Sequence, residues 1–365
     1  MKSKISYSQC DEAFLKAMNE SVKEYFDTIN NKDKHGNWQL HLKATLLFAA
    51  YILCYSMIFV SESLTSLVLC YILMGPLTVF LALNIGHEAA HNIFCRSKRW
   101  NNLWVKIFDF LGACSQVWVY KHVHSHHAHT NVYKVDLELQ QSEIVRIFPQ
   151  DVHRRFHKFQ HLYMPVLYCI YTLVWFCYRD FIDYKKLRKV TAKKHLRSSD
   201  LKFFGAKVIY ISRMIVIPIM LCPFDWTAII LAFVIGNIVS SVTVTFALIS
   251  THVGEHSHFP EPDENGRIGH SWVRHQFLTT SDFSTNNKLV TALYGGFNHH
   301  LTHHLFPYVS HVHYPAITER IKIISDKFKV ATFPQPNIWS AIQSHFKLLI
   351  ERSRAGQPSL EWMEM

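Results

Sequence analysis

The sequence has little charge for its length, and its cysteines show no pattern typical of a disulfide framework. Charged residues make up 18% of the 365 residues, compared with about 25% in ordinary soluble proteins. The eight cysteines form no C-x-x-C pair and several lie inside apolar runs, so we expect buried free thiols. The first 40 residues are polar and contain no signal-peptide core, so any membrane insertion must use internal segments.

The chain does have long apolar runs, in keeping with a hydrophobic fraction of 49%. A spanning helix needs about 20 predominantly apolar residues. Four runs predict such spans, and tight turns join them into two hairpins; the runs are residues 44–60, 64–86, 204–221 and 226–250. The predicted fold is therefore an all-α polytopic membrane protein with four transmembrane helices.

Two further apolar segments are predicted to lie at the membrane surface. Residues 103–120 are interrupted by Lys106 and Asp109, which is typical of an interfacial amphipathic helix. Residues 162–178 are rich in Tyr and Trp and precede a strongly basic stretch at 185–202. Neither segment is predicted to cross the membrane.

The chain is basic, with a formal net charge of +11 and a pI near 9.2. In a soluble protein such a balance would suggest nucleic-acid binding. Here the basic residues flank apolar runs, as at 183–189 and 193–197. This placement favours an anionic cytoplasmic membrane surface, or acidic redox partners and substrates, and we expect no nucleic-acid partner.

Histidines gather in three clusters, each beside an apolar run. Imidazole is the commonest protein ligand for transition metals. Within each cluster the spacing of three to five residues lets a helix present the rings on one face, and a further histidine closes the last apolar run. Nine ligands, enough for two metal ions, are predicted: His87, His91, His122, His126, His127, His252, His300, His303 and His304.

The alternative is that these clusters are solvated helix-surface pairs or a metal-scavenging tract. The third cluster argues against it, because it lies between Gly295 and Pro307 in an apolar, turn-rich setting. Other histidines are predicted to be supporting, tunnel-lining or interfacial groups instead of ligands: His124, His129, His256, His258, His299, His311 and His313.

A single site requires all clusters to lie on one face of the membrane. An even number of crossings must then separate the second cluster from the third, yet three apolar candidates lie between them. The basic stretch belongs in the cytoplasm by the positive-inside rule, so 162–178 is predicted to be re-entrant or interfacial. Both termini and all clusters are then cytoplasmic. Arg213 is costly inside the third span, so it either snorkels or the span is shifted.

The motifs resemble the three histidine boxes of the membrane-bound fatty acid desaturases. The resemblance runs from about Asn84 to beyond Pro315, and the closest-looking branch is the bacterial linoleoyl-CoA-type or acyl-lipid desaturases, related to front-end desaturases. The first box is residues 86–92, the second is 121–136 and the third is 295–307. Two more segments also match the family: 246–260, which precedes the third box, and 275–283.

The resemblance implies a non-heme centre of two iron ions that uses O2 to remove two hydrogens from adjacent methylenes of an acyl chain, as an acyl-lipid or acyl-CoA. Asn298 lies one helical turn or less from His300 and His303, so we expect it to support the ligands directly or through water. Asp136 and Glu138 either orient ligand histidines or are solvated loop acids. His300 stands where front-end members typically carry Gln, which leaves the position of the double bond open.

The sequence has no His-Pro-Gly-Gly heme motif of the fused cytochrome-b5-like domain that many front-end members carry. A separate electron donor of the ferredoxin or cytochrome b5 type is therefore expected. The predicted organisation is a cytosolic segment 1–43, a membrane domain 44–315 with a cytosolic helical cap that carries the boxes, and a cytosolic helical segment 316–365. The expected membrane is a bacterial inner membrane, or the endoplasmic reticulum in a eukaryote.

Two other functions are compatible with part of this pattern. A lipid hydroxylase or ketolase of the same superfamily would carry the same boxes. A metal transporter or storage protein would require ionisable residues inside the spans, but residues 44–60 and 226–250 contain none.

Overall fold

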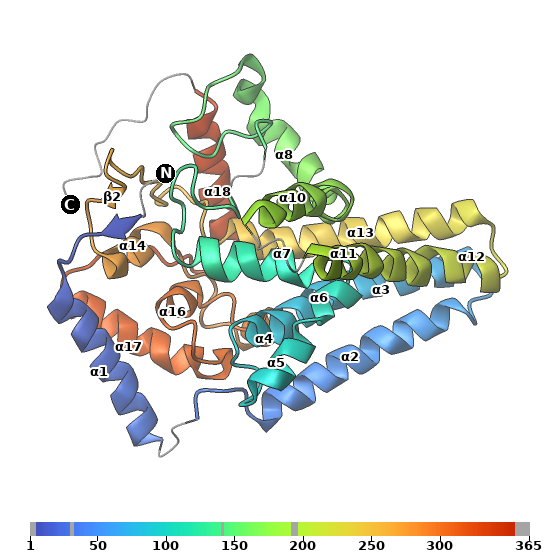
Figure 1. The fold of residues 1–365 in the computed structure, drawn as a ribbon, viewed down its shortest axis with the longest axis horizontal. Coiled ribbons are helices and arrows are strands. Elements are labelled where there is room, and N and C mark those ends of the chain that lie inside the picture. The colour runs from blue at the N-terminus through green and yellow to red at the C-terminus, as the bar shows by residue number, and fades with distance from the viewer. Residues whose placement is uncertain (1–4, 30–32, 140–141, 191–195, 355–365) are drawn as a thin grey trace.

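The structure is a computed structural model that describes residues 5–29, 33–139, 142–190 and 196–354. Figure 1 shows long helices that extend together to one side, with shorter helices gathered at their other end. Four helical segments are long and apolar enough to cross a membrane: Trp38–Ile58, Leu64–Ala90, Ser198–Leu221 and Trp226–Ile249. The predicted all-α architecture with four spans is confirmed.

The second and third spans are continuous helices that contain π-helical turns. The first span is α2 (Trp38–Ile58) and the fourth is α13 (Trp226–Ile249). The second consists of α3 (Leu64–Leu81), η1 (Ala82–His87) and α4 (Glu88–Ala90). The third consists of α11 (Leu196–Ile211), η6 (Ser212–Val216) and α12 (Ile217–Leu221).

A capping side chain begins the fourth span, and glycines allow two of the spans to pack closely. Asp225 caps α13, because its side chain accepts hydrogen bonds from the backbone of Thr227 and Ala228, which satisfies free N–H groups of the first turn. Helices α3 and α13 approach closely at Gly75 and Gly236. A Cβ added at Gly75 would lie 2.7 Å from the Gly236 carbonyl oxygen, so only glycine permits this contact.

The single helix predicted over residues 103–120 is instead a series of short helices: α5 (Lys98–Trp104), α6 (Ile107–Phe110), α7 (Ser115–Val119) and η2 (Tyr120–His126). Gly112 has a φ of 95°, which a helix does not accommodate. Asp109 then accepts hydrogen bonds from the backbone and hydroxyl of Ser115 at 2.8 and 2.7 Å. The positive φ of Gly112 and the hydrogen bonds of Asp109 therefore interrupt the helix, although the apolar sequence alone predicts a continuous one.

The apolar segment around residues 162–178 forms two helical arms bent by 73°. The arms are η3 (Arg155–Phe159) with α8 (Gln160–Cys169), then α9 (Tyr171–Val174), η4 (Trp175–Arg179) and α10 (Asp180–Val190). At the bend, Thr172 bonds to the middle of α13, since its N–H donates to Ser241 Oγ at 3.0 Å and its hydroxyl to the Asn237 carbonyl at 3.0 Å. By length and composition alone this pair is either a broken fifth span or a re-entrant hairpin.

Arg213 has partners within the protein. Its guanidinium donates to the Phe110 carbonyl at 2.6 Å and to Tyr51 Oη at 3.1 Å. It also lies over the Phe110 ring, 4.0 Å from its centroid. Hydrogen bonds and a cation–π contact therefore offset the cost of this charge inside the membrane region.

The remaining elements form a cap at the histidine-rich end of the spans (Figure 1). Strands β1 (Ser6–Tyr7) and β2 (Arg267–Ile268) pair in parallel. A hydrophobic cluster that includes Phe14, Phe277 and Ile317 joins helices of the cap. The cap helices are α1 (Glu12–Thr28), α14 (Trp272–Thr279), α15 (Lys288–Leu293), α16 (His300–Leu305), η7 (His311–His313), α17 (Tyr314–Lys327) and α18 (Ile338–Arg352).

Candidate metal centre

Eight of the nine histidines singled out in the sequence come together in two groups of four. Within each group, one nitrogen of every ring lies within 4.8 Å of the others. The first group is His87, His91, His122 and His303, and the second is His126, His252, His300 and His304. Each group draws on segments more than 100 residues apart, so only the folded chain assembles it.

His127 lies between the two groups. Its Nε2 is 3.2 Å from Nε2 of His122, and its ring centroid is 4.3 Å from that of His304. His127 directly follows η2 and lies five residues after His122, and a π-helical turn brings residues at this spacing together. Its position between the groups is compatible with binding to a metal ion near either one.

Hydrogen bonds fix the orientation of most of these rings through Nδ1. His122 Nδ1 lies 2.9 Å from Glu138 Oε2, and His126 Nδ1 lies 2.9 Å from Asp136 Oδ2. Carboxylates only accept, so each of these histidines carries a proton on Nδ1, and its neutral form presents a lone pair on Nε2. The structure thus decides a question that the sequence left open: both acids orient histidines of the groups.

Three further supporting groups have no signal of their own in the sequence. His252 Nδ1 donates to the Thr279 carbonyl at 2.9 Å. His304 Nδ1 lies 3.0 Å from Gln276 Oε1, and His303 Nδ1 lies 3.0 Å from Tyr314 Oη. Gln276 and Tyr314 belong to segments that resemble the family, but only long-range contacts show which histidine each one holds.

The converging nitrogens fit a metal. His126 and His252 both use Nδ1 to donate, yet their Nε2 atoms lie 3.1 Å apart. Two lone pairs at this distance repel each other unless a cation or a shared proton lies between them. Within the described part of the chain, the buried Nε2 atoms of His91 and His304 have no hydrogen-bond partner. Imidazole donors with one nearby carboxylate are a set that iron, zinc, copper and nickel all accept.

Burial keeps most of these imidazoles neutral, as metal binding requires. It lowers the pKa of His252 to about 3 and places the pKa of His300 and His304 well below the usual range. For His126, burial also lowers the pKa, but the adjacent Asp136 carboxylate outweighs it and the pKa is raised. An incoming cation would therefore compete with a proton mainly at His126.

The seven histidines predicted not to be ligands all lie outside the two groups. His124 is exposed, while His299 bonds to Thr318 and His311 contacts Glu88. Asn298 is fully buried and donates to the Ser284 carbonyl and to Thr291. These bonds hold the preceding loop, and no described hydrogen bond joins Asn298 to a histidine of either group.

Comparison with known proteins identifies the family. Residues 62–336 match the family model described as fatty acid desaturase. The chain belongs to the fatty acid desaturase family. It is therefore an oxidoreductase, and with four apolar helices it is an integral membrane protein.

Curated relatives of this desaturase-family chain cover nearly all of it. It is 29% identical to a sn-1 linoleoyl-lipid 6-desaturase of Synechocystis over 96% of this chain and 98% of the relative. A sn-1 linoleoyl-lipid 6-desaturase of Arthrospira platensis is 25% identical over 93% of this chain and 92% of the relative. An acyl-lipid (8-3)-desaturase of Physcomitrium patens is 28% identical over 94% of this chain and 73% of the relative.

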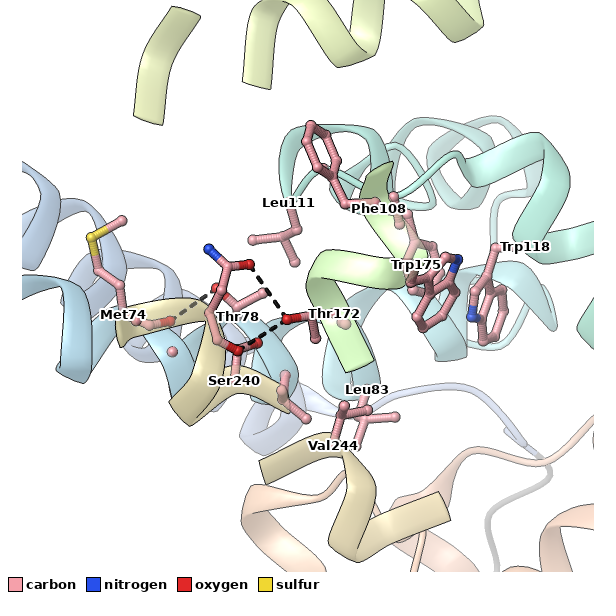
Figure 2. A pocket seen from close by; sticks show the side chains of 18 of the residues that line it. Met74, Thr78, Leu83, Phe108, Leu111, Trp118, Thr172, Trp175, Ser240 and Val244 are labelled. Carbon is pink, nitrogen blue, oxygen red and sulfur yellow. Dashed lines mark hydrogen bonds between the residues drawn. The ribbon is translucent and has the colours of Figure 1, made fainter. Parts of the chain in front are cut away.

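Two cavities of this desaturase-family chain meet at the histidine groups. The outer cavity, about 910 Å³, is lined by His126, His252 and His300, and by His345 of α18. The inner cavity, about 130 Å³, runs between α3, α9 and α13 and is shown in Figure 2. The side chains shared by both walls lie beside the groups: His122, Glu138, Trp175, Leu248 and Phe297.

Proposed function

We propose that this chain is a non-heme di-iron acyl-lipid desaturase that uses O2 and two electrons from a separate carrier to introduce a C=C bond into an acyl chain. The observation that carries the proposal is the position of two facing groups of four imidazoles where the two cavities meet. The relatives are named for acyl-lipid and linoleoyl-lipid desaturation, which favours a membrane lipid over acyl-CoA as the substrate.

The proposed ligands are the nine histidines, divided as the two groups with His127 between them. Glu138 is a further candidate, because one of its carboxylate oxygens lies within 4.8 Å of nitrogens of His122 and His126. Iron bound here would activate O2, the oxidant that removes hydrogen from an unactivated methylene, which is chemistry that no side chain supplies. The groups that bond to Nδ1 would hold the rings in place for it.

The protein itself contributes positioning and the exclusion of water. The lipid headgroup would lie in the outer cavity and the acyl chain would pass Leu248 and Phe297 into the inner one. These two apolar side chains flank the histidines, so a bound chain is held against the centre by contacts along its length. Fixing one pair of methylenes in this way removes the entropic cost of orienting a flexible chain during the reaction.

The proposed topology places the histidine groups and both termini in the cytoplasm, in a bacterial inner membrane or the endoplasmic reticulum. It treats the bent pair as a re-entrant hairpin, because its bend is bonded to the middle of α13. Electrons would come from a ferredoxin or cytochrome b5 type protein. The proposed domain boundaries remain 1–43, 44–315 and 316–365.

Expression in a host of known lipid composition tests this function. We expect a lipid product two hydrogens lighter than its precursor, about two iron ions per purified chain, and loss of the product in His303→Ala. Substitution of the exposed His124 by Ala serves as the matched control and should leave product formation intact. A product heavier by one oxygen would instead identify a hydroxylase, and metal uptake into vesicles without any lipid product would identify a transporter.

A further inference from the structure

Helix α16 carries three of the proposed ligands, yet its own sequence does not cap it. The first N–H groups of a helix have no partner within the helix and need one from elsewhere. His299 stands at the position before the first helical residue, and its side chain makes no capping hydrogen bond. A capping group for α16 must therefore come from another segment of the chain.

Asp282 supplies that group. Its Oδ1 accepts a hydrogen bond from the Leu301 N–H at 2.8 Å, and the His300 N–H also donates to the carboxylate. Asp282 is only 8% exposed, and among the described residues the groups that stabilise its charge are these backbone N–H groups and no side-chain cation. Burial of a carboxylate is costly, and a cation usually offsets the cost. Here the positive end of α16 takes the place of that cation.

The segment that contains this acid, residues 279–282, also holds the facing ligand His252. The Thr279 carbonyl accepts a hydrogen bond from His252 Nδ1 at 2.9 Å. The Ser281 N–H donates to the carbonyl of the residue before His252 at 2.7 Å. The Nε2 atoms of His252 and His300 lie 2.8 Å apart. One short segment therefore bonds to the chain on both sides of this pair of imidazoles.

The other two ligands of α16 have partners of their own. His303, in the first group, has its Nδ1 3.0 Å from Tyr314 Oη. His304 Nδ1 lies 3.0 Å from Gln276 Oε1. By contrast, His300 Nδ1 is buried with no hydrogen-bond partner in the part of the chain that the structure describes. The position of the His300 ring therefore depends on where the backbone of α16 begins.

We propose that Asp282 is a positioning residue, which places His300 beside His252 through its hydrogen bonds to the first turn of α16. It is not itself among the ligands, and it completes the second group of four imidazoles by fixing the backbone. The proposal rests on the proposed function, because it takes the second group to be a metal site. The first group contains one residue of α16, which is held by its own bond to Tyr314. Removal of Asp282 should therefore weaken the second site and spare the first.

Titration of the purified, metal-free protein with Co²⁺, followed by visible absorption, tests this role. We expect the wild type to bind two ions, one at each group. In Asp282→Ala the binding of one ion should weaken about ten- to a hundredfold, as for other residues that orient metal ligands, while the other ion keeps its wild-type affinity. In Asp282→Asn the amide oxygen can still accept from the Leu301 N–H, so the affinity for both ions should return to near the wild-type level.

Three results of this titration would overturn the proposal. Equal weakening of both ions in Asp282→Ala would indicate a general loss of structure. Unchanged binding would show that α16 keeps its position without the bond, and failure of Asp282→Asn to restore binding would exclude the hydrogen bond as the cause. Asp282→Ser, whose acceptor is shorter, takes the place of Asp282→Ala if the latter does not fold, and the same selective weakening is expected of it.

Asp263 provides a matched control. It is an exposed acid of the cap that lies outside both histidine groups. Its Oδ1 accepts from the backbone N–H groups of Asn265 and Arg267 at 2.9 and 2.7 Å, which is the same kind of bond. Asp263→Ala should bind both Co²⁺ ions as the wild type does, and a selective loss of one ion in this variant would contradict the role of Asp282.

The Co²⁺ titration also separates this proposal from the proposed function. Selective loss of one ion in Asp282→Ala supports the proposal even if the wild type forms no desaturated lipid, in which case the desaturase function alone fails. A desaturated product from the wild type, together with equal ion binding in the wild type and Asp282→Ala, would leave the function standing and overturn the role of Asp282.

Discussion

Five of the nine proposed metal ligands have a hydrogen-bond partner at Nδ1 that orients the ring. A histidine can bind through either nitrogen, and the hydrogen bond at one nitrogen decides which is free. In this chain Nδ1 is the bonded nitrogen for His122, His126 and His252. All three Nε2 atoms consequently face the centre of their groups, so the geometry of the site depends on partners that are not themselves among the proposed nine.

Substitution of Asp136 tests whether an acid that orients a ligand histidine is needed for iron binding. It is fully buried and accepts from His126 Nδ1 and from the Asn131 backbone, both at 2.9 Å. We expect Asp136→Asn to lower iron retention or turnover by about ten- to a hundredfold, because the amide N–H₂ opposes a proton on Nδ1. Iron content and product yield measure this. Asp326→Asn, an exposed acid on α17 outside both cavities, is the control; a comparable loss there would show that the effect of Asp136→Asn is not specific to the metal centre.

Arg213 is a charged residue inside a span that was nevertheless predicted correctly. From the sequence, a charge within an apolar run questions the span, because a charge in hydrocarbon is costly. The structure supplies partners from distant segments, the Phe110 carbonyl and Tyr51. Hydropathy averaged over a whole helix identifies the span correctly, while the fate of the single charge depends on contacts that no local window contains.

Among the helices, the features that could be predicted are those determined by neighbouring residues in the sequence. The long spans are predictable because 18 or more apolar residues carry their own evidence. The breaks at Gly112 and near Ile170 are not, because they depend on a positive φ in one case and on bonds from Thr172 to α13 in the other. Both breaks lie next to a cavity wall, so the unpredicted features are those that shape the binding path.

The stability of the contacts made by helix α18 is expected to depend on pH. His345 on this helix lines the outer cavity, is fully buried, lies 2.7 Å from the Val253 carbonyl through Nδ1 and bonds to Tyr168. Burial lowers the pKa of His345 to about 4. The folded state thus binds fewer protons than the unfolded state, and stability is lost as the pH falls below about 6.5, the usual pKa of histidine, toward 4.

We expect this single group to cost about 2 kcal/mol of stability between pH 7 and pH 5. Thermal unfolding of the purified protein at the two pH values, compared with His345→Gln, isolates the contribution. The variant should lose less stability on acidification than the wild type, whereas substitution of the exposed His124 by Gln should not alter the pH dependence. An identical pH dependence in the wild type and His345→Gln would mean that α18 does not couple to this titration.

For the whole molecule, the histidine spacing predicts a metal site but not its internal division. Spacings of three to five residues identify eight of the nine residues because helical geometry is local, and the end of the last apolar run identifies His252. Their partition into two groups joins His87 with His303 and His126 with His300, pairings that require the spans and the cap to meet. Gln276 and Tyr314 could not be assigned for a similar reason, since each bonds to a histidine on another helix.

The path of the chain through the membrane is the last property to test, because a single assembled site requires it. Single cysteines are introduced on a background without the eight native ones, at Glu62 in the turn between α2 and α3, at Glu319 in the cap, and at Lys186 on α10; all three positions are exposed. A membrane-impermeant thiol reagent should label Glu62→Cys in intact cells. Glu319→Cys and Lys186→Cys should react only after permeabilisation, since four crossings place both on the side of the histidine groups. Labelling of Lys186→Cys from outside would contradict this topology, because the bent pair would then be a fifth span and α10 would lie on the other side of the membrane from His122. The structure argues against that outcome, since Lys121, next to His122, forms an ion pair with Asp183 of α10 at 2.9 Å.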